Sequence, residues 1–124
     1  MRTIKFRGKD RKWFYGSHVQ LRDEHFIVRN EPSIGKMFCS NLVEPDTVGQ
    51  FTGLKDKNGV EVYEGDIVRY RPNNKTYQVV FKDGIFWGED NNGCGCAAHF
   101  FPACEIIGNV FDNSELIEKG GKHE

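Results

Sequence analysis

Residues 50–69 constrain the fold most strongly, because they place two tight turns between short segments of β type. The pair Asn58-Gly59 tolerates the positive φ angles that a two-residue hairpin turn requires. A second turn is expected at Gly65, just before residues 67–70, which are rich in β-branched and aromatic side chains. A chain with this centre is expected to consist of β-strands joined by glycine turns.

Period-two alternation of polar and apolar residues recurs along the chain, and helical periodicity is almost absent. Gly16 is expected to end the second strand, Pro45 to open a turn, and residues 114–118 to form one helical turn. Residues 33–44 show no clear pattern. The expected strands are residues 3–7, 12–15, 25–29, 48–53, 60–63, 67–70, 76–81, 85–87 and 105–111. Short strands at such close spacing predict a small barrel or a strongly bent sheet.

The composition fits a small β-rich domain. A length of 124 residues predicts one domain, with or without a small appendage. Hydrophobic residues make up 38% of the chain and aromatic residues 13%, so a few large rings are expected to form the core. At this size neither metals nor disulfides are required for folding, and the four cysteines are expected to be reduced thiols.

The charge is nearly balanced, with a formal net charge of −1, which disfavours a nucleic-acid-binding domain. The N-terminal fifteen residues are the exception: six basic side chains accompany one acidic side chain, a local net charge of +5. No apolar run follows these charges, and no segment approaches the roughly 18 apolar residues of a membrane span. We therefore expect a soluble protein that stays in the compartment where it is made.

The basic N-terminus combines the two parts of a single-strand-binding surface, cations for phosphates and rings for bases. The residues are Arg7, Lys9, Arg11, Lys12, Trp13, Phe14 and Tyr15, which Arg69, Tyr70 and Arg71 could extend. The alternative, which we favour, is that the rings fill the core while the basic side chains protect exposed strand edges.

One cluster contains the ligand types that zinc prefers: Cys94, Cys96, His99 and Cys104. The Cys-x-Cys spacing is tighter than in the usual zinc knuckle, which separates the two cysteines by two to four residues. A metal site and a redox pair therefore remain as alternatives, and we favour free, partly buried cysteines beside a loop. The isolated Cys39 is expected to be a small core residue.

The sequence lacks the usual marks of an enzyme. It contains no nucleophile elbow, phosphate-binding loop or dinucleotide fingerprint, and Ser17-His18 has no placed acidic partner. A catalytic role for Asp56, Glu64 and Asp66 would need two carboxylates in one pocket, whereas turn chemistry explains them adequately. We therefore expect no catalytic residues, no cofactor and no enzymatic activity.

Three blocks of the chain resemble the YopX family of phage and prophage proteins. The first comprises residues 4–7 with Asp10, Trp13 and Phe14, the second residues 50–68, and the third residues 106–116. The ungapped match over residues 52–59 is the most specific part. Gly16 to Asp46 and Trp87 to Ala103 match no fixed pattern of the family.

The resemblance implies a mainly β protein: a small mixed-sheet pseudobarrel with an additional N-terminal α+β element, and self-association. We assign residues 1–47 to the α+β element, 48–111 to the pseudobarrel, and 112–124 to a short helical turn and flexible tail. The run from Gly65 to Tyr70 also looks like the opening strand of an SH3-like barrel. The family has no assigned activity to transfer.

These observations together predict a non-enzymatic, homo-oligomeric binding or scaffold module of the bacterial cytoplasm, whose partner is an unidentified phage or host protein. One alternative is a nucleic-acid-binding accessory protein that uses the basic aromatic N-terminus. The other is a metal-dependent protein that uses Cys94, Cys96, His99 and Cys104.

Overall fold

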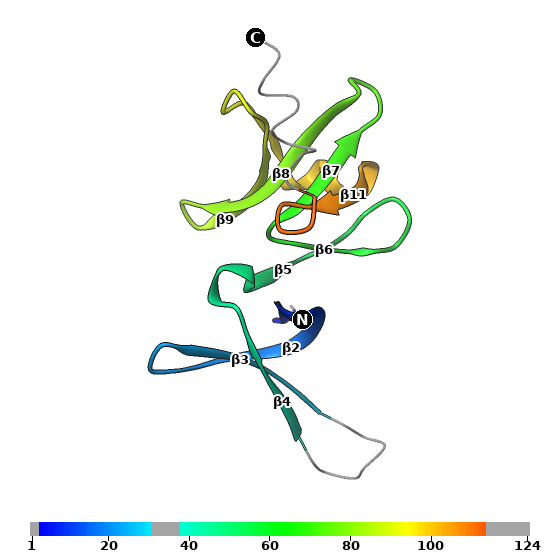
Figure 1. Cartoon of the computed structure of the whole chain (residues 1–124). Coiled ribbons are helices and arrows are strands. Elements are labelled where there is room, and N and C mark those ends of the chain that lie inside the picture. The colour runs from blue at the N-terminus through cyan, green and yellow to red at the C-terminus, as the bar shows by residue number, and fades with distance from the viewer. Residues whose placement is uncertain (1–2, 31–37, 114–124) are drawn as a thin grey trace. The chain divides into compact units, whose positions relative to one another are not determined.

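The computed structural model describes residues 3–30 and 38–113 and divides the chain into two compact units, Met1–Phe51 and Thr52–Glu124. Each unit is considered by itself below. Figure 1 shows the mainly β architecture, with β2 and β3 joined as one hairpin and β8 and β9 as another. The elements are β1 (Phe6–Asp10), β2 (Lys12–Leu21), β3 (Glu24–Asn30), β4 (Phe38–Val43), the 3₁₀ turn η2 (Pro45–Thr47), β5 (Gly49–Lys55), β6 (Glu61–Tyr63), β7 (Asp66–Tyr70), β8 (Lys75–Lys82), β9 (Ile85–Glu89), β10 (Gly95–Ala97), the 3₁₀ turn η3 (Ala98–Ala103) and β11 (Glu105–Asn109).

The prediction of a mainly β fold is confirmed, with two corrections. The described part of residues 1–47 consists of β1 to β4 and the turn η2, and contains no α-helix, so the expected α+β element is seen there only as β. The strand pairings found among the described residues are antiparallel, not mixed. The helical turn expected at residues 114–118 lies outside the described residues.

Gly16 does not end β2, contrary to the sequence prediction. The strand runs through it to Leu21 and pairs with β3 from Ser17 onward. A Cβ atom at position 16 would lie 2.3 Å from the carbonyl oxygen of Val28, so only glycine allows the backbones to approach this closely. The glycine permits strand packing here, and no turn follows it.

The strands of unit one follow the antiparallel order β4-β3-β2-β1-β5. We call one face of this sheet the inner face; on it, side chains of β3 and β4 pack closely over the backbone of β1. A Cβ atom at Gly8 of β1 would meet Val43 Cγ2 at 2.7 Å and Ile27 Cγ1 at 3.1 Å. Ile27 and Val43 are buried and pack against Gly8. Register places Phe6 and His18 on the same inner face.

In unit two, five strands form an antiparallel sheet in the order β10-β9-β8-β7-β11, and η3 connects β10 to β11. β7 is its first strand in chain order, as the run from Gly65 to Tyr70 predicts. The core consists of Val62, Val68, Tyr77, Val79, Phe101 and Cys104. Tyr77 and Val79 alternate with more exposed residues along β8, as the period-two pattern predicts. β10 and η3 occupy a segment that the sequence predicts only as a loop.

The buried carboxylate of Asp56 ties the hairpin turn between β5 and β6 to the start of β11. Its Oδ1 accepts hydrogen bonds from the amides of Asn58 and Val60 at 2.8 and 2.9 Å. Its Oδ2 accepts a bond of 3.0 Å from the amide of Ile106, fifty residues further along the chain. The amide of Lys57 donates to the carbonyl of Cys104 at 2.9 Å and reinforces the same connection. One side chain therefore fixes both a local turn and a long-range strand position.

Asp66 and Asn113 play comparable roles in two other turns. Asp66 Oδ2 accepts a hydrogen bond of 2.7 Å from the amide of Tyr63 and closes the turn between β6 and β7. Asn113 Oδ1 accepts one from the amide of Asn109 at 3.3 Å, after β11. The turn chemistry expected of these polar residues is therefore present.

We predict that Asp56→Ala lowers the free energy of unfolding of unit two by on the order of 3 kcal/mol, because three amide donors lose their acceptor. Urea denaturation followed by circular dichroism measures this. The matched control is Asp90→Ala, since Asp90 Oδ1 accepts from the amides of Asn92 and Cys94 in an exposed turn without a long-range bond. The control should cost about 1 kcal/mol; equal losses in both variants would show that the bond to Ile106 contributes nothing.

Candidate functional site

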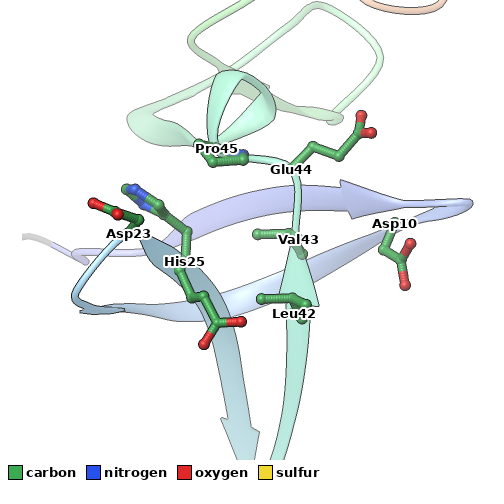
Figure 2. A pocket seen from close by; sticks show the side chains of 8 residues that line it. Asp10, Asp23, His25, Leu42, Val43, Glu44 and Pro45 are labelled. Carbon is green, nitrogen blue, oxygen red and sulfur yellow. The ribbon is translucent and has the colours of Figure 1, made fainter.

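An open hollow of about 280 Å³ lies in unit one, beside the turn between β2 and β3. It is lined by Asp10, Asp23, Glu24, His25, Leu42, Val43, Glu44 and Pro45. Figure 2 shows Asp23 and His25 on one side of the segment that leads from β4 into η2, and Asp10 and the Glu44 carboxylate on its other side. Four carboxyl groups and one imidazole thus line the hollow, together with the apolar side chains of Leu42 and Val43. This group is not apparent from the sequence, because its members come from three separate segments of the chain.

His25 also takes part in a histidine pair with His18 on the inner face of unit one. His18 Nε2 lies 2.8 Å from His25 Nδ1, which is hydrogen-bond distance, and the ring centroids are 5.1 Å apart with planes 9° from parallel. The ring of Phe6 on β1 lies 5.5 Å from that of His18. Burial lowers the pKa of His18 below its usual 6.5, and the nearby His25 lowers it further. The two imidazoles therefore form a coupled pair across the β2–β3 hairpin.

The opposite face of the same hairpin, which we call the outer face, carries an apolar row. Val19 on β2 is the direct partner of Phe26 on β3, and Phe26 is the direct partner of Leu42 on β4. Val19 is 38% exposed, Leu42 is 50% exposed, and Phe26 is half-buried. Leu21, 61% exposed, lies on the same side two residues beyond Val19. The outer face thus presents large apolar side chains from three adjacent strands to solvent.

In the basic aromatic N-terminus, cationic side chains lie close to aromatic rings. The Arg7 guanidinium lies 4.5 Å from the centroid of the Trp13 ring, and Lys9 Nζ lies 5.9 Å from it. Lys12 and Arg29 lie 5.6 and 5.9 Å from the Phe14 centroid. Arg7 is buried, and both rings are half-buried.

These contacts within unit one engage many of the side chains that the sequence predicts for nucleic-acid binding. Tyr15, 46% exposed, and the exposed Arg11 and Lys12 remain accessible. The proposed extension through Arg69, Tyr70 and Arg71 lies in unit two, where Arg71 Nε donates to Glu105 Oε1 at 2.6 Å.

The four residues of the predicted metal cluster are spread over the segment around β10 and η3. Cys94 and His99 are exposed, Cys96 is half-buried, and Cys104 is buried. The His99 ring packs against Phe100 at a centroid distance of 4.4 Å. Within residues 3–30 and 38–113, no three His, Cys, Asp or Glu side chains lie together so that they could hold a metal ion. The structure therefore does not assemble the ligand set that the sequence suggested.

The four cysteines are free thiols, and their surroundings differ. Burial raises the pKa of Cys104 to about 11, and the neighbouring Cys96 and Asp56 add to the shift. Burial also raises the pKa of Cys96, against an opposing hydrogen bond with the backbone of Gly88. Cys104 Sγ donates to the carbonyl of Phe100 at 3.3 Å. Cys39, for which the sequence predicts a small core residue, is half-buried on β4.

The carboxylates of the central turns do not converge on a pocket. Asp56 and Asp66 are buried and accept backbone hydrogen bonds in two different turns. Glu64 lies in the second of these turns and is half-buried. Their surroundings match the structural interpretation made from the sequence.

No helix among the described residues is long and apolar enough to cross a membrane.

Comparison with known proteins gives a family and a fold. The model of the family described as YopX protein matches residues 5–118. The crystal structure of protein EF1440 from Enterococcus faecalis is similar to this chain with a TM-score of 0.59 and 24% sequence identity. That similarity covers 94% of this chain and 99% of EF1440, and at this identity it shows the fold alone. A comparison with curated proteins gives no significant match.

We predict that the cysteines react with iodoacetamide in the order of their exposure. At about pH 8 the exposed Cys94 should be alkylated first, and Cys104 should react only after unfolding, because burial keeps its thiol protonated. Peptide mass spectrometry over time measures both. If Cys104 were modified as quickly as Cys94 in the folded protein, the buried position of Cys104 would be wrong.

The raised pKa of Cys104 also predicts a loss of stability in alkali. The unfolded chain releases this proton near the usual 9.0, whereas the folded chain keeps it until about 11. The unfolded state therefore binds fewer protons in this window, and the free energy of unfolding falls as the pH rises through it. Urea denaturation of the protein and of Cys104→Ala across this range tests the assignment, since the variant should lack this contribution.

Proposed function

The chain belongs to the YopX family, and we propose that it acts as a non-enzymatic, homo-oligomeric binding or scaffold module. The proposal includes a phage or prophage origin and a place of action in the bacterial cytoplasm. The observation that carries it is the apolar outer face of β2, β3 and β4, together with the edge strand β4.

The outer face is suited to a protein contact because its apolar side chains are adjacent and not scattered. Val19, Phe26 and Leu42 lie in one line across three strands, and Leu21 extends the patch. Contiguous apolar surface of this kind marks interaction sites in soluble proteins, because burying it against a partner removes it from water.

Strand β4 adds a second element of recognition. It is the last strand in the order β4-β3-β2-β1-β5, so among the described strands it pairs only with β3. An edge strand offers backbone donors and acceptors to a further strand. The occupant that we propose is a second copy of the chain. In an isologous contact, the β4 edge and the apolar row of each copy are covered by those of the other.

The non-enzymatic part of the proposal is supported by how the polar groups are used. The buried carboxylates of Asp56 and Asp66 are engaged with backbone amides. The thiol of Cys104 is kept protonated by burial, which disfavours a nucleophilic role at neutral pH.

We predict that the protein self-associates at micromolar concentration and that Leu42→Lys weakens this association by on the order of tenfold or more. Burying a leucine side chain contributes about 1.5–3 kcal/mol, and a lysine would also bring like charges together. Sedimentation velocity over a concentration series measures the dissociation constant.

The matched control is Ile85→Lys, which changes a side chain that is 57% exposed on β9 in unit two. It should leave the dissociation constant unchanged. A protein that remains monomeric at all concentrations would contradict the proposal, and equal weakening by both variants would contradict the assigned face.

The second candidate is nucleic-acid binding through the N-terminus. It is favoured by one observation: the ring of Tyr15 is 46% exposed on the strand that also carries the exposed Lys12, next to Arg11. Gel shifts with single-stranded oligonucleotides at low and high salt test it. Absence of binding at low salt would remove this candidate, since phosphate contacts are strongest there.

A further inference from the structure

We propose that His18 and His25 form a proton-operated clamp on the β2–β3 hairpin, closed near neutral pH and opened when both imidazoles carry a proton. The clamp lies on the inner face, and the adjacent residues Val19 and Phe26 form the apolar row of the outer face. The consequence for self-association rests on the proposed function; the clamp itself does not.

The hydrogen bond between the two rings requires one nitrogen to donate and the other to accept. A neutral pair can form it, and so can a pair with one proton added, because a charged imidazole still donates to a neutral one. A pair with two added protons has donors only. At a nitrogen–nitrogen distance of 2.8 Å, two donors and two like charges cannot remain in place.

The surroundings determine which charges act on the pair. The hollow that His25 helps to line is also lined by carboxyl groups: Asp10 on β1, Asp23 in the β2–β3 turn, Glu24 on β3, and Glu44 after β4. His18 instead faces the ring of Phe6 on β1. On the same face of β3, the Arg29 guanidinium lies 5.9 Å from the centroid of the Phe14 ring. A proton on His18 must therefore enter a partly buried site beside an aromatic ring and next to a second imidazole.

The direction of the pH effect follows from His18. Its pKa is lowered by burial and then by His25, so the unfolded chain binds this proton at a higher pH than the folded chain does. Below the usual value of 6.5 the unfolded state therefore binds more protons, and the stability of the hairpin falls as the pH falls. Each unit by which the pKa is lowered corresponds to about a tenfold change in the opening equilibrium.

Opening the hairpin displaces the outer face as well. Successive residues of a strand point to opposite sides, so rings that separate on the inner face shift the backbone that positions Val19 and Phe26. Acidification should therefore loosen both the hairpin and any contact made by the apolar row.

The first test is amide hydrogen exchange by NMR between about pH 8 and about pH 5, expressed as protection factors corrected for the intrinsic exchange rate. In the wild-type protein, protection of β2 and β3 should fall by about tenfold or more on acidification, while protection of the β8–β9 hairpin in unit two changes little. In His18→Phe, which keeps a ring against Phe6 without a titrating group, the fall should disappear. The matched control His99→Gln, at an exposed histidine of unit two, should behave as the wild type.

The second test is sedimentation velocity at the same two pH values. Self-association that weakens on acidification in the wild type and in His99→Gln, but not in His18→Phe, supports the link to the outer face. If the protein is monomeric at every pH, the proposed function fails while hydrogen exchange still decides on the clamp. Equal protection of β2 and β3 at both pH values, or an unchanged pH response in His18→Phe, would overturn the clamp.

Discussion

Unit two depends most on the hydrogen bonds of the Asp56 carboxylate, because they hold a local turn and a distant strand at the same time. The carboxylate closes the turn after β5 locally and holds the amide of Ile106 at the start of β11. β11 is the edge strand of the five-stranded sheet and pairs with β7. The bond to Asp56 therefore positions the start of this edge strand. A charged group can be buried there because backbone amides surround its oxygens. This explains how an acidic residue in the hairpin turn serves a structural role.

Unit one follows a different principle, the strict separation of two sheet faces. The inner face holds Ile27, Val43 and the histidine pair above Gly8, whereas the outer face presents Val19, Phe26 and Leu42. Because alternate residues of the same strands supply both faces, a change in one face is transmitted to the other through the backbone. In the proposed clamp, the histidine pair and the apolar row are therefore connected through the strand backbone that they share.

The sequence predicted the parts of the fold that depend on local chemistry. The Asn58-Gly59 turn, the strands around it and the turn at Pro45 follow from residue preferences within a few positions. The prediction that Gly16 ends a strand is wrong, because a glycine that permits close strand packing has the same local signature as one that ends a strand. Two features of the candidate site, the histidine pair and the apolar row, depend on register between strands. His18 lies on β2 beyond Gly16, where the sequence predicts the end of the strand, and the apolar row needs β4, which lies in a segment without readable periodicity.

The placement of the two tryptophans has a practical consequence. Trp13 lies in unit one beneath Arg7, and Trp87 lies in unit two, where it pairs with Val80 and Ala97. The chain contains two tryptophans, so each unit carries its own fluorophore in a distinct environment, one beside a guanidinium and one between neighbouring strands. Replacing either ring by phenylalanine leaves a single optical reporter in the other unit. The cooperativity of the whole chain can then be read directly as the coincidence, or the separation, of two emission transitions.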